Sequence, residues 1–158
     1  MIQFLKELWK VLRRSTPDKA GTATVSPDER VARFIYQKSD WSKQATPKPK
    51  PKVFLPTKEA GQWETSVCRV HVVPEQRIWK IANRVRSPLP ALARADLTAN
   101  SIVVAGLCTE PAPDLEADYP EHAVIVGWPE EKEKQMALSI QLASSADLVF
   151  APSSAPIS

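Results

Sequence analysis

The sequence predicts an α+β fold: a small, mainly antiparallel sheet with helices packed on one face, preceded by an N-terminal amphipathic helix. Three stretches rich in β-branched residues, 65–73, 100–109 and 122–127, predict strands. A loop of about a dozen residues joins the last two, so they can pair antiparallel. Apolar residues with helical spacing lie between the strands. We therefore expect one α+β domain over residues 26–150.

The net charge of +3 on the 158 residues is unevenly distributed. Residues 1–52 carry 12 Lys and Arg against 5 Asp and Glu, whereas residues 53–158 carry 9 against 13. A basic segment of this kind favours an anionic partner, such as a nucleic acid, a membrane surface or an acidic protein. It is equally suited to contact the acidic remainder of its own chain.

Cysteine usage and hydropathy indicate a cytoplasmic protein. Cys68 and Cys108 lie in apolar stretches and no CxxC pair is present, so we expect two buried thiols rather than a disulfide or a zinc site. No apolar run approaches the ~20 residues that a membrane-spanning helix needs. The N-terminal residues lack the cleavage site of a secretory signal. We expect neither a metal nor a cofactor.

Residues 1–14 have the pattern of a basic amphipathic helix. A helix of this length is marginal alone in water, so its apolar side should be covered. The cover is its own domain, a second copy in a homo-oligomer, or a groove on a partner protein; a membrane surface is the least favoured. The residues expected to bind a partner are Leu5, Leu8, Trp9 and Leu12. Small polar residues at 15–25 indicate a linker.

Segment 26–38 has the pattern of a second helix. Ser26 is the expected N-cap, Pro27 the first helical residue and Glu29 the capping-box partner. This helix would bury its apolar residues and leave Arg33 toward solvent or a ligand.

Residues 39–56, which we call the Lys/Pro strap, alternate proline with lysine between positions 47 and 52. Alternate prolines favour an extended backbone. Such a segment suits single-stranded nucleic acid, because lysines contact phosphates while aromatic rings stack on bases. The candidate nucleic-acid-binding residues are Trp41, Lys48, Lys50 and Lys52. The other interpretation is a solvated basic loop across the domain surface.

The middle of the chain alternates strand and helix patterns. The strand 65–73 is followed by a helix from Pro74 to about Arg86, whose basic residues form an exposed stripe. A proline-broken connection is expected at 87–99. The acidic, proline-rich segment 110–120 predicts a loop, and it is a candidate internal partner of the Lys/Pro strap.

The stretch Glu121–Leu148 predicts a core-forming unit of a strand, a tight corner and a helix. Pro129 is suited to the first helical position, and the acidic residues after it favour a helix start through the helix dipole. A short edge strand at 147–151 and a flexible tail at 151–158 complete the chain.

His71 and His122 are both expected in strands. Such a pair resembles the two-histidine phosphoesterases, whose motif is His, any residue, then Thr or Ser, and the resemblance implies acid–base chemistry on a phosphoester. Here the third positions are Val73 and Val124, which donate no hydrogen bond to a phosphate. No glycine-rich phosphate loop or nucleophile elbow is present. We therefore expect no catalytic residue, and an enzyme is the third and least favoured hypothesis.

The segments RFIYQKSDWSKQ, KPKVFLP, SVCRV, IWKIANRV, RADLTANSIVVAGL and HAVIVGWPEEKEKQ follow in an order that resembles a group of small bacterial proteins associated with mobile elements and antiviral defence. The resemblance covers about residues 33–148. It implies a bacterial accessory protein, and it brings no catalytic residues. The leading hypothesis is therefore a non-enzymatic interaction subunit that binds a partner protein of the same system, and the alternative is a module that binds DNA or RNA.

The leading hypothesis predicts the effect of charging the apolar side of residues 1–14. Replacing Leu5→Asp and Leu8→Asp together should abolish partner binding, because two carboxylates would have to be buried in an apolar groove. Co-purification measures the binding, and circular dichroism shows whether the domain remains folded. Unchanged partner recovery from a folded double variant would contradict the hypothesis.

Overall fold

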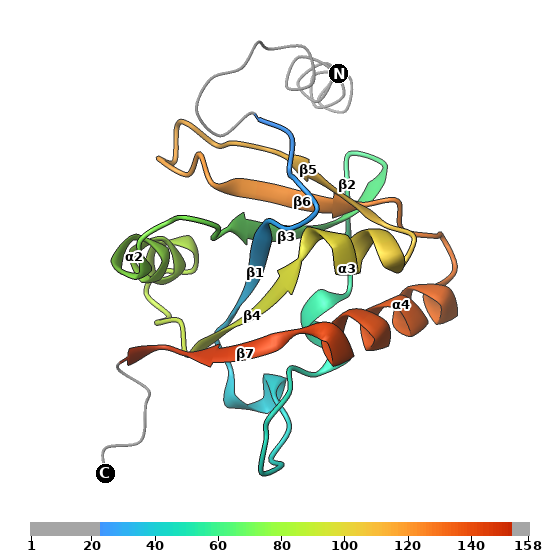
Figure 1. The fold of residues 1–158 in the computed structure, drawn as a ribbon, viewed down its shortest axis with the longest axis horizontal. Helices are drawn as coiled ribbons and strands as arrows, with labels where there is room; N and C mark the ends of the chain where they lie inside the picture. The colour runs from blue at the N-terminus through green and yellow to red at the C-terminus, as the bar shows by residue number, and fades with distance from the viewer. Residues whose placement is uncertain (1–22, 153–158) are drawn as a thin grey trace.

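The computed structural model describes residues 23–152, which form a seven-stranded sheet with three α-helices and two short 3₁₀ helices (Figure 1). The strand order is β5-β6-β3-β1-β4-β7, and β2 pairs with β3 outside this path. The strands are β1 (Arg30–Ile35), β2 (Thr57–Glu59), β3 (Gln62–Arg69), β4 (Ala93–Thr98), β5 (Cys108–Pro111), β6 (His122–Val126) and β7 (Asp147–Phe150). The helices are η1 (Lys38–Asp40), η2 (Pro51–Phe54), α2 (Glu75–Val85), α3 (Ala99–Val104) and α4 (Lys132–Ser145).

All strand pairings of the described residues are antiparallel, which confirms the predicted α+β class with an antiparallel sheet. The expected helix at 1–14, most of the linker at 15–25 and nearly all of the tail lie outside the described residues.

The helices divide between the two faces of the sheet, because successive strand residues point to opposite sides. Val31, Ile35 and Val67 lie in the main core cluster with residues of α3, α4 and η2. Ala32 and Cys68 lie in a second cluster with residues of α2. The sequence predicted helices on one face of the sheet. In the structure, α3 and α4 share one face and α2 lies on the other.

The helix predicted for 26–38 is wrong, because residues 30–35 form the central strand. The predicted capping-box contact exists: the Ser26 N–H donates to the Glu29 carboxylate at 3.3 Å. It closes a turn instead of starting a helix. Arg69 of β3 also holds the Glu29 carboxylate, at 2.6 Å, and β1 then pairs with β4 at six positions. Pairing with distant strands has overridden a local helix signal.

The strand predicted for 100–109 is also wrong, since α3 precedes β5 in this segment. The Thr98 hydroxyl accepts a hydrogen bond from the Ser101 N–H at 3.2 Å and so caps α3. Gly106, with φ of +85°, allows the chain to turn after the helix. The preceding segment, expected as a connection, contains β4, whose apolar pattern is interrupted by the buried residues Arg94 and Asp96.

The other elements follow the local signals closely. Helix α2, strands β6 and β7, and the antiparallel pairing of β5 with β6 are as predicted. Strand β3 ends at Arg69, so His71 lies in the following turn. Helix α4 begins at Lys132 rather than at Pro129, whose carbonyl oxygen accepts a hydrogen bond from the Gln135 side chain.

An ion cluster around the buried residues Arg94 and Asp96 attaches α2 to β4. The Arg94 side chain, 7% exposed, donates to Asp96 at 2.9 Å and to both carboxylate oxygens of Glu75 at 2.8 and 3.0 Å. Its guanidinium lies 5.3 Å from the ring centroid of Trp79, which also donates to Glu75. Burial raises the pKa of Asp96, and the charge of Arg94 opposes this effect. The cluster therefore depends on Arg94 to neutralise a buried carboxylate.

We predict that Arg94→Met lowers the free energy of unfolding by about 3–5 kcal/mol, because it leaves the Asp96 carboxylate buried without a counter-charge. Arg30→Met, which removes an exposed ion pair with Asp147 on the same sheet, should cost less than about 1 kcal/mol. Urea denaturation of both variants measures the difference. Equal losses would show that the buried cluster has no special weight.

Candidate functional site

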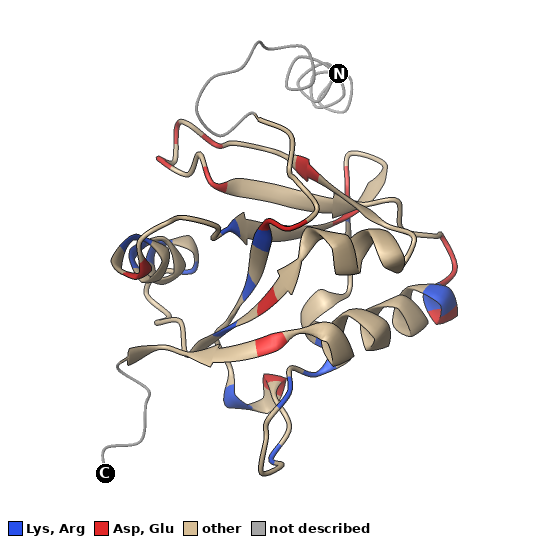
Figure 2. Ribbon diagram, viewed as in Figure 1, with Lys and Arg blue, Asp and Glu red and all other residues tan. Residues whose placement is uncertain are grey.

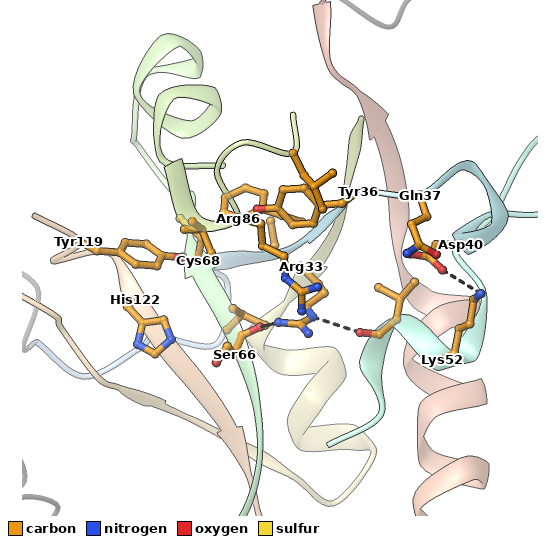
Figure 3. Close-up of a pocket in the computed structure, with 16 residues that line it drawn as sticks. Arg33, Tyr36, Gln37, Asp40, Lys52, Ser66, Cys68, Arg86, Tyr119 and His122 are labelled. Atoms are coloured by element: carbon orange, nitrogen blue, oxygen red, sulfur yellow. Dashed lines mark hydrogen bonds and ion pairs between the residues drawn. The ribbon is translucent and has the colours of Figure 1, made fainter. Parts of the chain in front are cut away.

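The candidate site lies where the two central strands separate. Strand β1 pairs with β4 at six positions but with β3 at only two, Val31 with Arg69 and Ala32 with Cys68. Beyond these pairs lies a cavity of about 410 Å³. Its walls come from β1, β3 and η2, from the end of α2, and from the loop between β5 and β6 (Figure 3).

Arg33 occupies the centre of this opening (Figure 3). Its Nε donates to the carbonyl oxygen of Val53 at 3.2 Å, and its Nη1 donates to the carbonyl oxygen of Ser66 at 2.9 Å. The guanidinium thus bridges β1 to β3 and η2 where direct strand pairing has ended. Both acceptors are uncharged. Burial, reinforced by the positive charge of Arg86, lowers the pKa of Arg33.

A second guanidinium, that of Arg86, lies near Arg33 just after α2 (Figure 3). It lies over the ring of Tyr36, 5.7 Å from the centroid. The Tyr36 hydroxyl donates to the Ala82 carbonyl oxygen at 2.7 Å, and burial raises the pKa of Tyr36 to about 12. The phenol therefore remains neutral at ordinary pH and offers Arg86 a ring face instead of an anion.

Arg33 and Arg86 differ from the other arginines of residues 23–152 in having no carboxylate partner. Each of the other five forms an ion pair of 3.4 Å or less; they are Arg30, Arg69, Arg77, Arg84 and Arg94. The remaining charged residues at the cavity, Lys52 and Asp40, are paired with each other at 3.0 Å. The cavity therefore holds two positive charges that form no ion pair with a carboxylate in the described part of the chain.

One end of the cavity is formed by Cys68, Tyr119 and His122 (Figure 3). Cys68 and His122 are register partners on β3 and β6, and the rings of Tyr119 and His122 lie 5.1 Å apart. The His122 Nδ1 lies 2.8 Å from the Ala112 carbonyl oxygen, which fixes the ring. Burial raises the pKa of the Cys68 thiol to about 12 and also raises the pKa of Tyr119. The thiol is therefore protonated at neutral pH and unsuited to nucleophilic attack.

The Lys/Pro strap folds back on itself instead of running as a single extended segment. Trp41 forms an antiparallel bridge with Pro49, and the Ser42 N–H donates to the Lys48 carbonyl oxygen. The Trp41 ring packs on the main core and meets Phe150 edge-on at 5.3 Å. This packing leaves the ring poorly placed to stack on a base.

The three strap lysines have different surroundings. The Lys48 amine donates to the carbonyl oxygen of Ala146 at 2.9 Å, where α4 ends and a positive charge is favourable. Lys50 is exposed, and Lys52 pairs with Asp40 beside the cavity. The residues predicted to bind nucleic acid are thus not gathered on one surface, and Lys52 is the one that lines the cavity.

In the described part of the chain, the ion pairs of the acidic loop at 110–120 are formed with α2 and not with the Lys/Pro strap. Asp118 pairs with Arg77 and Arg84 of α2, and Glu121 pairs with Arg77. Figure 2 shows the basic residues of α2 and the acidic residues of the loop between β5 and β6 on the same side of the molecule. Two of the basic residues in the predicted stripe, Arg77 and Arg84, are therefore neutralised within the fold.

The two histidines do not line the same cavity. His122 lines it, whereas His71 is exposed in the turn after β3 and is absent from its walls. The phosphoesterase hypothesis requires both side chains in one cleft. The expectation of two buried thiols holds for Cys68 but is wrong for Cys108, which is exposed at the start of the edge strand β5. Leu5, Leu8, Trp9 and Leu12 lie outside the described residues.

Two general properties also bear on the site. Within residues 23–152, no group of three or more His, Cys, Asp or Glu side chains is arranged to hold a metal ion. In the same range, no helix combines the length and the apolar character that crossing a membrane requires.

Comparisons with known proteins give no match to a family model, to a curated protein or to a solved structure. The candidate site therefore stands on its own geometry, and the resemblance to bacterial defence and mobile-element proteins remains an expectation from the sequence.

The sequence does not identify Arg33 and Arg86 as a pair. It predicts Arg33 on a helix and Arg86 in the exposed basic stripe of the helix that follows Pro74. The strand-favouring residues Val31, Phe34 and Ile35 were the signal that could have placed Arg33 on a strand. No sequence signal relates it to a residue more than fifty positions away.

We predict that iodoacetamide at pH 8 modifies Cys108 in the folded protein and leaves Cys68 unmodified. With a pKa of about 12, only about one Cys68 in ten thousand is a thiolate at that pH, and burial further limits access. Mass spectrometry of digested protein locates the label, and labelling in urea should reach both cysteines. Rapid native labelling of Cys68 would contradict the buried, protonated thiol.

Proposed function

We propose that this chain is a non-enzymatic binding protein whose cavity takes the anionic group of a ligand between Arg33 and Arg86. One observation carries the proposal: among the seven arginines of residues 23–152, the two without a carboxylate partner are the two that line the cavity. This proposal keeps the expectation of a cytoplasmic accessory protein and adds a ligand to it.

The energetics of a partly buried guanidinium support an anionic ligand. Removing a positive charge from water is unfavourable unless a counter-charge and hydrogen bonds compensate. Arg33 donates two of its five N–H groups to carbonyl oxygens, so its remaining donors have no acceptor described within the fold. A phosphate or carboxylate placed there would accept charge-assisted hydrogen bonds from both arginines.

The protonation states at the cavity support binding rather than catalysis. Burial raises the pKa values of Cys68 and Tyr36 to about 12, and it also raises that of Tyr119. These three groups are neutral at physiological pH, so they act as hydrogen-bonding and packing groups and not as nucleophiles or bases.

We predict that Arg86→Gln weakens the binding of inorganic phosphate or pyrophosphate about tenfold or more, since a hydrogen bond to a charged group contributes about 1.5–3 kcal/mol. Arg86 is exposed at the end of α2, so the variant should fold. Lys80→Gln is the matched control, because it removes one positive charge from the same helix outside the cavity. Isothermal titration calorimetry of the full chain at low salt measures both.

Two results would contradict the proposal. If neither anion binds the unaltered protein at millimolar concentration, the cavity is not an anion site. If Lys80→Gln weakens binding as much as Arg86→Gln does, the effect comes from overall charge and not from the cavity.

A further inference from the structure

The cavity is larger than an inorganic anion needs. Its volume of about 410 Å³ falls in the range of pockets for small organic ligands, about 300–1,000 Å³. A phosphate held between Arg33 and Arg86 would leave most of this space to water. The ligand should therefore carry a sizeable group beside its anionic one.

The walls next to the arginines suit a flat, partly apolar group. The rings of Tyr119 and His122 stand together on one side of Arg33 (Figure 3). Val85 and Leu89 also line the cavity, and they remain 50% and 51% exposed. Aliphatic side chains that face a cavity and stay half-exposed gain most from a ligand that covers them with apolar surface. An aromatic ring system fits the contact with Tyr119 and His122.

Polar groups lie between and beyond these walls. Ser66, whose backbone carbonyl anchors Arg33, lies between that arginine and His122 in Figure 3. Its exposed hydroxyl can both donate and accept a hydrogen bond. On the far side of Arg33 lie Gln37 and the Lys52–Asp40 pair. In order along the cavity, the chain therefore offers aromatic, hydroxyl and cationic contacts.

This order matches the order of parts in a nucleotide, which runs from base through sugar to phosphate. We infer that the ligand is a nucleoside monophosphate unit, with its phosphate between Arg33 and Arg86, its sugar beside Ser66 and its base against Tyr119 and His122. The inference rests on the proposed anion-binding function and names the class of ligand. The unit is either a free nucleotide or the phosphorylated end of a single strand.

A phosphotyrosine side chain shares the phosphate and the aromatic ring, but it lacks hydroxyl groups between them. It would leave Ser66 without a partner from the ligand, so the nucleotide is the better match. Phosphotyrosine is therefore a competitor in the test.

The test compares affinities of the full chain for inorganic phosphate, the four ribonucleoside 5′-monophosphates, adenosine and phosphotyrosine by titration calorimetry. At least one nucleotide should bind about tenfold or more tightly than phosphate, because base stacking adds to the anion contacts. If phosphate binds and no nucleotide binds more tightly, the nucleotide inference fails while the anion site stands. If no anion binds, both proposals fail. Tighter binding of phosphotyrosine than of every nucleotide would also overturn the inference.

Two variants locate the base. Tyr119→Leu should weaken nucleotide binding severalfold and leave phosphate binding unchanged, since it removes an aromatic ring from the assigned base contact. Leu115→Asn is the control, because Leu115 is 62% exposed in the same loop between β5 and β6 and does not line the cavity. Equal effects of the two variants, or a loss of phosphate binding in Tyr119→Leu, would contradict the assigned orientation.

The same titration with a 5′-phosphorylated tetranucleotide separates the two sources. Tighter binding of the oligonucleotide identifies a strand end as the ligand, and tighter binding of the free nucleotide identifies a metabolite. Binding of a tetranucleotide without the 5′-phosphate as tightly as the phosphorylated one would show that the arginines do not read a terminal phosphate, and would overturn the inference.

Discussion

The unequal pairing of β1 is the constraint on which the rest of the structure depends. This strand is bonded to β4 along its whole length but to β3 only at its beginning. A central strand cannot leave its neighbour without exposing backbone groups, and those groups need other partners. Arg33 supplies two of the donors from its side chain. One residue therefore links β1 to β3 and η2 and places a partly buried positive charge in the middle of the sheet.

The position of the second arginine follows from the ion cluster on the same molecule. Arg94, Asp96 and Glu75 hold the start of α2 against β4, and the ring of Trp79 covers the cluster. With its first turn fixed, the helix runs across the sheet and ends beside Tyr36, whose hydroxyl bonds the Ala82 carbonyl oxygen. Arg86 comes next in the chain. Arg94, which is neutralised, attaches the start of α2 to the sheet. Arg86, which has no carboxylate partner among the described residues, lies just after the other end of the helix and has the proposed role in binding.

Elements whose signals are local were predictable from the sequence, and those decided by distant contacts were not. Helix α2 and strands β6 and β7 have clear periodicity and clear ends. Strand β4 was missed because Arg94 and Asp96 interrupt its apolar face, and they are tolerated there because they neutralise each other. Strand β1 follows a genuine capping-box contact that leads to no helix. The cavity could not be predicted from the sequence either, because it begins where β1 and β3 stop pairing, and that pairing depends on contacts between distant residues.

The strand order also sets the sequence of events when the chain folds. Among the strands of residues 23–152, β1 is synthesised first, yet its partners β3 and β4 begin 32 and 63 residues later, at Gln62 and Ala93. The contact of Lys48 with Ala146 joins positions 98 residues apart. A fold with so many contacts between distant positions has a high contact order, which slows folding. On the ribosome, the central strand can meet β3 first but must wait for β4 to pair along its whole length, and the Lys48 contact of the strap must wait for the end of α4.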